Sequence, residues 1–295
     1  PNVAFNAGVR AIACAQGKWY VGGDFSSPTP HFLAIDQTSG ALDTWNPAAN
    51  GSVRALAVDG SSIYAAGDFT NIGGQPRNGL AELSLLSNIN IATAWDPAPD
   101  GTVRALQLDA SHVYAGGAFN NIGGAGHRGV ASLDRSTALA EAIAYDLDIT
   151  GSCNALALLN SELYIAGDFT TINGVAANRI GIVDATTGTL SANLGSSVVD
   201  GPVTAITLQS SLLFLCGNFS MVNGQLRNGV AALDPSSGGL NSFDPALTGG
   251  IAETVHGASD HLFIGGGFTG FNGFPGRSHA VYGACTGSEW FIDAD

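Results

Sequence analysis

The chain has 295 residues, a formal net charge of −14 and only 12% charged residues, while glycine is abundant at 41. The acid excess and the single lysine, Lys18, argue against a nucleic-acid partner, because phosphate contacts need Lys and Arg. No apolar run reaches the roughly 18 residues of a membrane helix, so we expect no membrane insertion. Apolar residues at helical spacing are scarce, which predicts an all-β protein.

One motif recurs along the whole chain. It is an aromatic residue followed by small residues and closed by a phenylalanine. A period of about 50 residues is typical of propellers and other repeat architectures. The copies of the motif lie at Tyr20–Phe25, Tyr64–Phe69, Tyr114–Phe119, Tyr164–Phe169, Phe214–Phe219 and Phe263–Phe268.

Each copy sits inside a unit that predicts four short strands. An apolar run such as Val53–Val58 comes first, and the motif forms the second strand. A Gly-rich loop, Thr70–Gln75 in the second unit, leads to a third strand at Gly79–Leu83. The fourth strand carries an aromatic before Asn-Pro or Asp-Pro, as in Trp95-Asp96-Pro97. Six such units predict a six-bladed β-propeller of four-stranded antiparallel blades.

We therefore expect one domain over residues 1–295. Residues 1–6 are predicted to form a closing strand, because Phe5-Asn6 repeats the aromatic-Asn end of a fourth strand. Glu289–Asp293 reads as a fourth strand as well, so two segments compete for one place. The predicted blades are residues 8–49, 50–99, 100–149, 150–199, 200–248 and 249–295.

The repeated pattern resembles a known family. The stretches that carry it are Trp95–Leu106, Tyr64–Ile72, Gly73–Leu83 and Arg227–Asp234. They are similar to the delta-60 repeat of large secreted bacterial proteins and to kelch repeats. The resemblance covers nearly the whole chain. It implies a propeller, usually extracellular, and no agreed activity.

The acidic residue of the motif is the first candidate site. Asp24, Asp68 and Asp168 share this position, and Asn218 replaces them in the fifth unit. A ring of carboxylates can bind calcium, which takes oxygen ligands. We expect instead a structural role, in which each side chain accepts hydrogen bonds from its own loop and from an arginine further along. The expected pairs are Asp68 with Arg77, Asp168 with Arg179 and Asn218 with Arg227.

A second candidate set lies one residue into the first strands. Arg10, Arg54 and Arg104 hold this position in the first three units, and Asn154, Thr204 and Glu253 hold it in the others. If the first strands line a channel, these side chains lie at one mouth of it and can hold an anion. The alternative is pairing of the arginines with nearby acidic groups.

The four cysteines predict neither a metal site nor a cofactor. Cys14, Cys153, Cys216 and Cys285 form no C-x-x-C pair and lie at no metal-ligand spacing from histidine. Bridges Cys153–Cys216 and Cys14–Cys285 are alternatives to free, core-filling thiols. The start at Pro1, without Met, suggested a processed secreted protein.

No catalytic motif is present, so the sequence predicts a binding protein and not an enzyme. We expect a non-catalytic, extracellular or cell-surface scaffold that presents a loop face to a protein, a glycan or another copy of itself. The expected face is made by the loops from strand two to three and from strand four to the next strand one. The alternative is a hydrolase or lyase that uses Arg10, Arg54, Arg104 and Glu253 at the channel mouth.

Overall fold

The described residues of the computed structural model form antiparallel strands and no helix, which confirms the all-β prediction. They are residues 3–86, 90–137, 147–194, 197–258, 261–272, 274–275, 279–283 and 289–290. No helix in these ranges is long and apolar enough to cross a membrane. The chain divides into two compact units, unit 1 (Pro1–Asp148) and unit 2 (Ile149–Asp295). Numbered by the predicted boundaries, repeats 1 to 3 lie in unit 1 and repeats 4 to 6 in unit 2.

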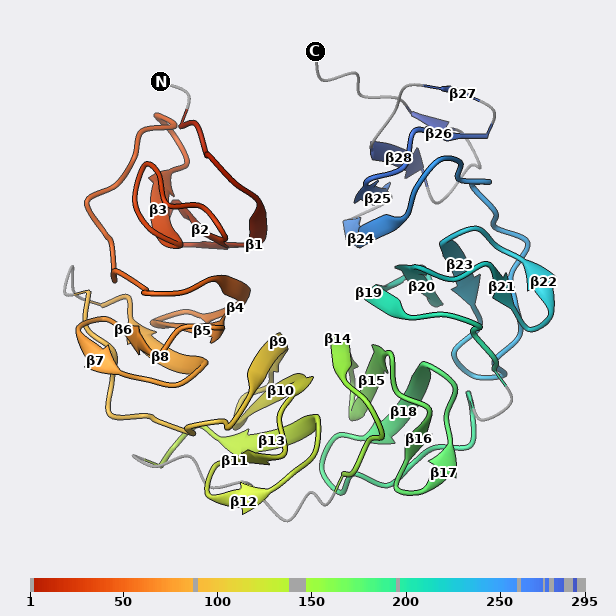
Figure 1. Ribbon diagram of the computed structural model, residues 1–295, viewed down its shortest axis with the longest axis horizontal. Helices are drawn as coiled ribbons and strands as arrows, with labels where there is room; N and C mark the ends of the chain where they lie inside the picture. Colours follow the sequence, from red (N-terminus) through yellow and green to blue (C-terminus); the bar gives the residue numbers. More distant parts are fainter. Residues whose placement is uncertain are drawn as a thin grey trace. The chain divides into compact units, whose positions relative to one another are not determined.

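Unit 1 contains three sheets of three strands each, with the middle strand of each sheet flanked by the other two. Figure 1 shows the first strands β1, β4 and β9 next to one another, with the third strands on the far side of each sheet. The sheets are β1 (Val9–Ala15), β2 (Lys18–Gly23) and β3 (Phe32–Asp36); β4 (Val53–Asp59), β5 (Ser62–Gly67) and β8 (Leu80–Ser84); and β9 (Thr102–Leu108), β10 (His112–Ala118) and β13 (Val130–Asp134).

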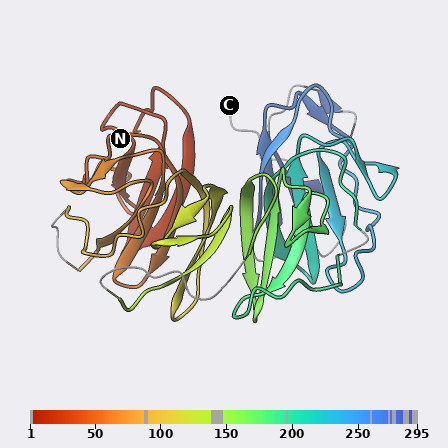
Figure 2. The ribbon, with the colours of Figure 1, turned by 60° about the horizontal axis from the view of Figure 1, so that its bottom comes forward.

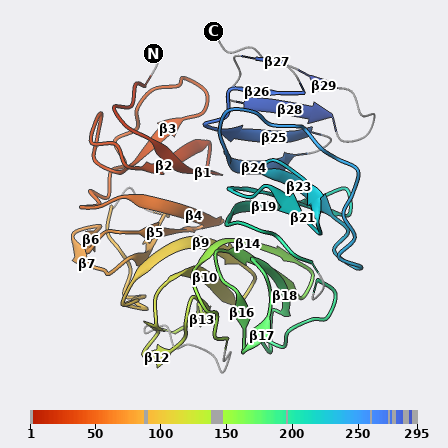
Figure 3. The same ribbon diagram turned by 45° about the vertical axis from the view of Figure 1, so that its right-hand side comes forward.

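Unit 2 repeats this pattern, and Figure 3 shows β24, β25 and β28 side by side in its last sheet. That sheet gains a fourth strand from the C-terminal segment. The sheets are β14 (Cys153–Leu159), β15 (Glu162–Gly167) and β18 (Ile180–Asp184); β19 (Val203–Gln209), β20 (Leu212–Gly217) and β23 (Val230–Leu233); and β24 (Ala252–Ala258), β25 (His261–Gly266), β28 (His279–Gly283) and β29 (Glu289–Trp290).

The Gly-rich loops form two-stranded hairpins from repeat 2 onward. In repeats 2 to 5 the turns have positive φ at both central residues, for example +60° and +69° at Gly73-Gly74 and +50° and +75° at Asn173-Gly174. Such turns favour Asn-Gly and Gly-Gly, because other residues are strained there. The hairpins are β6 (Asn71–Ile72) with β7 (Gln75–Pro76), β11 (Asn121–Ile122) with β12 (Ala125–Gly126), β16 (Thr171–Ile172) with β17 (Val175–Ala176), β21 (Met221–Val222) with β22 (Gln225–Leu226), and β26 (Gly270–Phe271) with β27 (Phe274–Pro275).

The predicted fourth strand is mostly reduced to a single bridge. Leu42 pairs with Ile35, and Ala92 pairs with Leu83 in the same way. The aromatic that follows turns into the core, where Trp45 is 3% exposed, and the next proline has no N–H to donate. Fully paired fourth strands were therefore a wrong expectation for repeats 1 and 2. Repeats 4 and 5 have the same bridged arrangement, at Val183–Leu190 and Leu233–Leu240.

The core lies between neighbouring sheets. Second strands are buried on both faces, as Tyr64, Ala65 and Ala66 show, and their small residues let adjacent sheets approach closely. Trp45 makes edge-on contacts with Tyr20 and Phe32, each at 4.9 Å between ring centroids. The same cluster includes Val53 and Phe69 of repeat 2, so each interface joins two repeats. In the tilted view of Figure 2 the strands of unit 1, red to yellow-green, run alongside one another.

The N-terminal segment belongs to repeat 1 and forms no strand. The Phe5 and Phe25 rings are 4.7 Å apart, and Asn6 accepts hydrogen bonds from the N–H groups of Ser26 and Ser27. Asn50 accepts the same two bonds from the loop of repeat 2. Asn6 therefore corresponds to Asn50, and the segment is the linker that enters repeat 1.

The place beside β28 is taken by β29, through pairs Val281–Trp290 and Tyr282–Glu289. Residues 3–6 form no strand, because the Asn6 side chain fixes a loop of its own repeat and does not end a strand. Closure of a ring by residues 1–6 stays a prediction.

The cysteines of the described residues are free thiols. Cys153 and Cys216 are buried and Cys14 is exposed, while Cys285 lies outside the described residues. The Cys153–Cys216 bridge is therefore wrong, while the Cys14–Cys285 bridge falls on a residue outside the described ones and stays a prediction. Burial raises the pKa of the Cys216 thiol to about 12, so it acts as a small apolar core residue.

Candidate functional site

The arginines of the second candidate set sit in β-bulges. In repeat 2, Val53 pairs with Gly67 and Ala55 with Ala66, so Arg54 is the extra residue. A bulge re-aims one side chain relative to the regular alternation of a strand. The same register shift occurs at each of the six equivalent positions, which are Arg10, Arg54, Arg104, Asn154, Thr204 and Glu253.

In repeats 1 and 2 the bulge aims the arginine at the motif aspartate of its own repeat. Nε and Nη2 of Arg54 both contact Oδ2 of Asp68 at 2.6 Å. Arg10 contacts Asp24 at 2.7 and 2.6 Å in the same manner. The hydrogen bond from Arg10 holds the pKa of the Asp24 carboxyl below its usual value. Burial alone would raise the pKa of Asp68, but the bonds from Arg54 and Thr102 lower it.

These contacts make Arg54 the partner of Asp68, in place of the expected Arg77. A double-mutant cycle of Arg54→Ala and Asp68→Ala should show a coupling free energy of about 0.5–1 kcal/mol, because the pair is only about a third exposed. A cycle of Arg77→Ala with Asp68→Ala should be additive. Urea denaturation of the four proteins in each cycle measures both. If the cycle of Arg77 with Asp68 shows coupling and the cycle of Arg54 with Asp68 is additive, the pairing of Asp68 with Arg54 is wrong.

Arg77 instead joins its hairpin to the fourth segment of the repeat. Its guanidinium donates to the carbonyls of Pro76 and Thr93 and lies 3.6 Å from Asp96. Arg227 makes the same set of contacts in repeat 5, with Leu226, Asn241 and Asp244. The predicted pairs Asp68–Arg77 and Asn218–Arg227 are therefore wrong. Sequence distance alone could not separate the two possible partners of each arginine.

The third predicted pair, Asp168 with Arg179, also differs. The Asp168 carboxylate accepts bonds from the N–H and hydroxyl of Ser152, and Arg179 donates to the Asp168 backbone carbonyl. Arg179 has a φ of +73°, at the place that Gly79 occupies in repeat 2. The Asp168 carboxylate therefore accepts hydrogen bonds from Ser152 of its own repeat, and the Arg179 side chain donates to the Asp168 backbone instead.

The bulge positions of unit 2 are neutral apart from Glu253. Asn154 donates to the Val203 carbonyl at 3.0 Å and Thr204 to the Ala252 carbonyl at 3.3 Å. Both bonds run to the first strand of the following repeat, so this position joins adjacent sheets. Among the described residues there is no group of three or more His, Cys, Asp or Glu side chains placed to hold a metal ion.

The loop face expected to bind a partner contains a groove in each unit. In unit 1 a groove of about 290 Å³ is lined by residues 67–70, 78–79 and 99–102. In unit 2 a groove of about 380 Å³ is lined by residues 217–219, 228–229 and 247–251. Both grooves lie where the loop from strand two to three meets the linker into the next repeat. The two therefore occupy equivalent places in the repeat.

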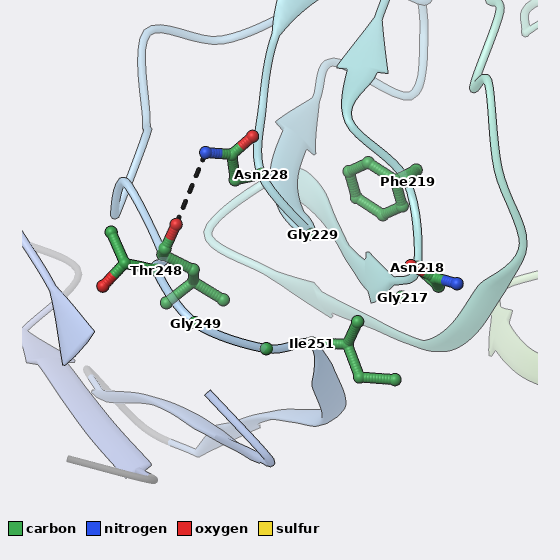
Figure 4. Close-up of a pocket in the computed structure, with 10 residues that line it drawn as sticks. Gly217, Asn218, Phe219, Asn228, Gly229, Thr248, Gly249 and Ile251 are labelled. Atoms are coloured by element: carbon green, nitrogen blue, oxygen red, sulfur yellow. Dashed lines mark hydrogen bonds between the residues drawn. The ribbon is translucent and has the colours of Figure 1, made fainter. Parts of the chain in front are cut away.

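Figure 4 shows the groove of unit 2. Asn228 and Thr248 stand on one side and Asn218 and Ile251 on the other, and the Asn228 amide donates to the Leu247 carbonyl at 3.4 Å. The groove of unit 1 differs in charge, since it has Asp68 and Asp100 among its lining residues.

A linker residue that the sequence analysis missed fixes the loop between strands two and three in four repeats, and in repeat 3 it lines the groove. Asp100 accepts bonds from the N–H groups of Asn120 and Asn121, and Asp200 does so from Ser220 and Met221. Asn50 and Asn6 make the same contacts in their repeats. The signal available in the sequence was an Asn or Asp about 20 residues before the hairpins of repeats 2, 3 and 5.

The opposite rim carries turns whose partly exposed carboxylates accept several hydrogen bonds, as Asp109 does. Burial by itself would raise the pKa of Asp109, but bonds from Tyr114, His112 and Ser111 lower it to about 2. Because the unfolded value is 3.8, the carboxylate stabilises the fold above about pH 4 and this contribution is lost as the pH falls towards 2.

Asp109→Asn should remove about 1 kcal/mol of this pH-dependent stability, a figure reduced for solvent screening. Melting temperatures between pH 2 and 6 measure the effect. The native protein should lose stability more steeply below pH 4 than the variant. Parallel curves would show that Asp109 is not the responsible group.

Comparisons with known proteins support the fold. A family described as a beta-propeller domain of unknown function, DUF5122, matches residues 61–85, which cover β5, the hairpin and β8 of repeat 2. No curated protein matches the chain. The family match is short, so it supports a β-propeller and leaves activity unassigned.

Solved structures resemble the chain over nearly its whole length. A chain of the Mitotic Checkpoint Complex has a TM-score of 0.61 at 12% identity, covering 96% of this chain and 77% of that chain. The computationally designed Ika8 protein has a TM-score of 0.54 at 13% identity, covering 98% and 87%. The dihydro-heme d1 dehydrogenase NirN has a TM-score of 0.57 at 13% identity, covering 95% and 56%. At such identities the likeness shows a propeller-like fold alone.

Proposed function

We propose that the protein is a non-catalytic binding scaffold built as a six-bladed propeller, with a kelch-like, delta-60 type of repeat. The observation that carries the proposal is the pair of grooves at equivalent places in repeats 2 to 3 and 5 to 6. Equivalent grooves on a rigid sheet framework suit a repeated or extended partner.

The exposure of repeat 1 supports the proposed ring. Val9 is 39% exposed and Ile12 is 62% exposed, whereas Val53 and Val103 are 0% exposed and Leu106 is 8% exposed at the equivalent places. In repeats 2 and 3 the sheet of the preceding repeat covers these residues. In a closed ring of six blades, repeat 6 would cover this apolar face of repeat 1.

The rival proposal of a hydrolase or lyase has less support. It needs Arg10, Arg54, Arg104 and Glu253 to act on a substrate at the first-strand ends. Arg10 and Arg54 are already engaged by Asp24 and Asp68. A structural role of these ion pairs in a scaffold accounts for them, and no catalysed reaction is needed to explain them.

The proposed partner is a protein, a cell-surface glycan or another copy of the chain, and the proposed place of action is outside the cell. The net charge of −14 disfavours nucleic acid. The proposal includes no cofactor and no calcium. Fold likeness by itself does not assign function, so the grooves have to be tested directly.

The test blocks the grooves one at a time. Asn78 and Asn228 are exposed lining residues, so Asn78→Trp and Asn228→Trp should fill the grooves without disturbing the core. The immobilised protein is exposed to a cell-surface extract, and the retained proteins and glycans are identified by mass spectrometry. A partner held by the native chain should be retained at least tenfold less by one or both variants.

Thr186→Trp, in an exposed turn on the opposite rim, is the control and should retain the partner unchanged. Equal retention by all variants would overturn the loop face as the binding surface. Turnover of a retained molecule would overturn the non-catalytic assignment.

A further inference from the structure

The repeats provide an internal control for which residues the fold needs. Glu82 on β8 pairs with Tyr64 across the sheet. The residues in this place in other repeats are small or apolar: Ala34, Ser132, Ile182 and Ala232. Four other repeats form the same sheet without a carboxylate here, so Glu82 is not required by the fold.

Arg135 is a second residue that does not recur. Its N–H donates to the Ser111 carbonyl, and the equivalent bond is made by Gln37, Leu85 and Ala185. None of these carries a charge. Among the arginines of the described residues, Arg135 alone lies neither at a bulge nor in the segment between strands two and three. Its side chain is only 14% exposed, which is unusual for a residue that the repeat does not need.

The two residues meet at Tyr64. Nε of Arg135 donates to the Tyr64 hydroxyl at 3.2 Å, and that hydroxyl lies 3.3 Å from Oε1 of Glu82. The guanidinium lies over the Tyr64 ring, 5.5 Å from its centroid. Nη1 donates to the Asp109 carbonyl at 2.6 Å, and Nη2 pairs with Asp59.

Glu82 is held as firmly as Arg135. The hydroxyls of Ser62 and Thr93 each donate to its carboxylate at 2.7 Å, one to each oxygen. Fixed donors and acceptors of this kind lose little conformational entropy when a ligand binds. The network is therefore preorganised in the absence of any ligand contact.

Both residues line one cavity of about 410 Å³ between repeats 2 and 3, on the rim opposite the grooves. This volume lies within the roughly 300–1,000 Å³ range of small-molecule sites. The remaining lining residues are Tyr64, Ala110, Ser111, Asp134 and Ser136. The cavity and its lining lie wholly within unit 1.

The lining selects a class of ligand. Asp59 balances the charge of Arg135, and the carboxylates of Glu82 and Asp134 repel an anion. Ala110 is the one aliphatic residue of the lining, so a hydrophobic ligand gains little. The lining offers carboxylate acceptors, a guanidinium donor and two serine hydroxyls, which both donate and accept hydrogen bonds. A ligand whose own groups both donate and accept hydrogen bonds suits this set.

We propose that this cavity is a binding site for a neutral saccharide of one or two rings, with Glu82 and Arg135 as the main hydrogen-bonding residues. The site is distinct from the loop-face grooves and does not depend on the function proposed for them.

The experiment titrates the full chain with neutral sugars: glucose, galactose, mannose, N-acetylglucosamine, lactose and cellobiose. Saturation-transfer NMR detects binding, and calorimetry measures its strength. The variants take residues from other repeats, so that they should fold: Glu82→Ala as in repeat 5, Arg135→Leu as in repeat 2, and Tyr64→Phe as in repeat 5. Each should weaken the binding of the best sugar at least tenfold.

Arg128→Leu is the matched control, because Arg128 is 54% exposed in a separate ion pair with Asp148. It should bind the sugar like the native chain. If no sugar shows saturable binding, or if the three cavity variants bind the best sugar as tightly as the native chain does, the proposal is wrong. Binding restricted to amines such as spermidine, or to glucuronate, would overturn the ligand class. Thermal denaturation of Tyr64→Phe, which removes one oxygen only, separates lost binding from lost folding.

Discussion

Replacement of Gly67 by alanine is expected to destabilise the protein by about 3 kcal/mol. A Cβ at this position would overlap the backbone carbonyl oxygen of Ser52 and lie 3.0 Å from the Cα atom of Val53. The Asp68 N–H donates to that same carbonyl at 2.9 Å. The backbone segments at Ser52 and Asp68 therefore cannot move apart without losing this hydrogen bond. The free energy of unfolding from urea titrations, followed by circular dichroism, measures the loss.

Gly126→Ala in the same unit is the control for this change. Its Cβ would meet only the Asn121 side chain, at 3.9 Å, and its φ is one that any residue adopts. We expect a change of less than about 0.5 kcal/mol. Equal effects of the two substitutions would contradict close backbone approach as the cause.

Trp45→Ala should destabilise the protein by about 3–5 kcal/mol. The indole is 3% exposed, and it contacts Tyr20 and Phe32 edge-on at the interface of repeats 1 and 2. Its removal leaves a cavity that the surrounding strands cannot fill, because each is held in its own sheet. Interfaces of this kind occur in both units. The loss in free energy of unfolding of Trp45→Ala therefore measures how much stability one interface supplies.

Trp19→Ala is the matched control, since Trp19 lies in the same repeat and is 42% exposed. It should cost less than about 1 kcal/mol. Circular dichroism is the suitable signal, because both changes remove a fluorescent residue. A loss at Trp45 no larger than the loss at Trp19 would show that the interface contributes little to stability.

Some features of the site could be predicted from single positions. The bulge residues Arg10, Arg54 and Arg104 were recognised because they recur one residue after a Val, and their pairing with nearby acidic groups was one of the expected outcomes. The partner was missed. Arg54 lies on β4 and Asp68, 14 residues further on, directly follows the neighbouring strand β5, and only the bulge turns the arginine towards the carboxylate.

The saccharide cavity could not be predicted, although both its main residues stand out in the printed sequence. Glu82 and Arg135 are 53 positions apart by their numbers, and they meet through the side chain of Tyr64 at the interface of two repeats. A pattern search for recurring residues passes over both, because their significance lies in not recurring.

The sequence by itself determined the strands, the turns and the repeat of this protein. Strand and turn preferences are local, since they depend on alternating burial, on Asn-Gly turns with positive φ and on aromatic residues at fixed spacing. Only the tertiary structure decided the partners of the charged side chains, the short fourth segment and the place of residues 3–8. Those depend on strand register, on the bulge and on the packing of neighbouring sheets, which bring together side chains that are distant in the sequence.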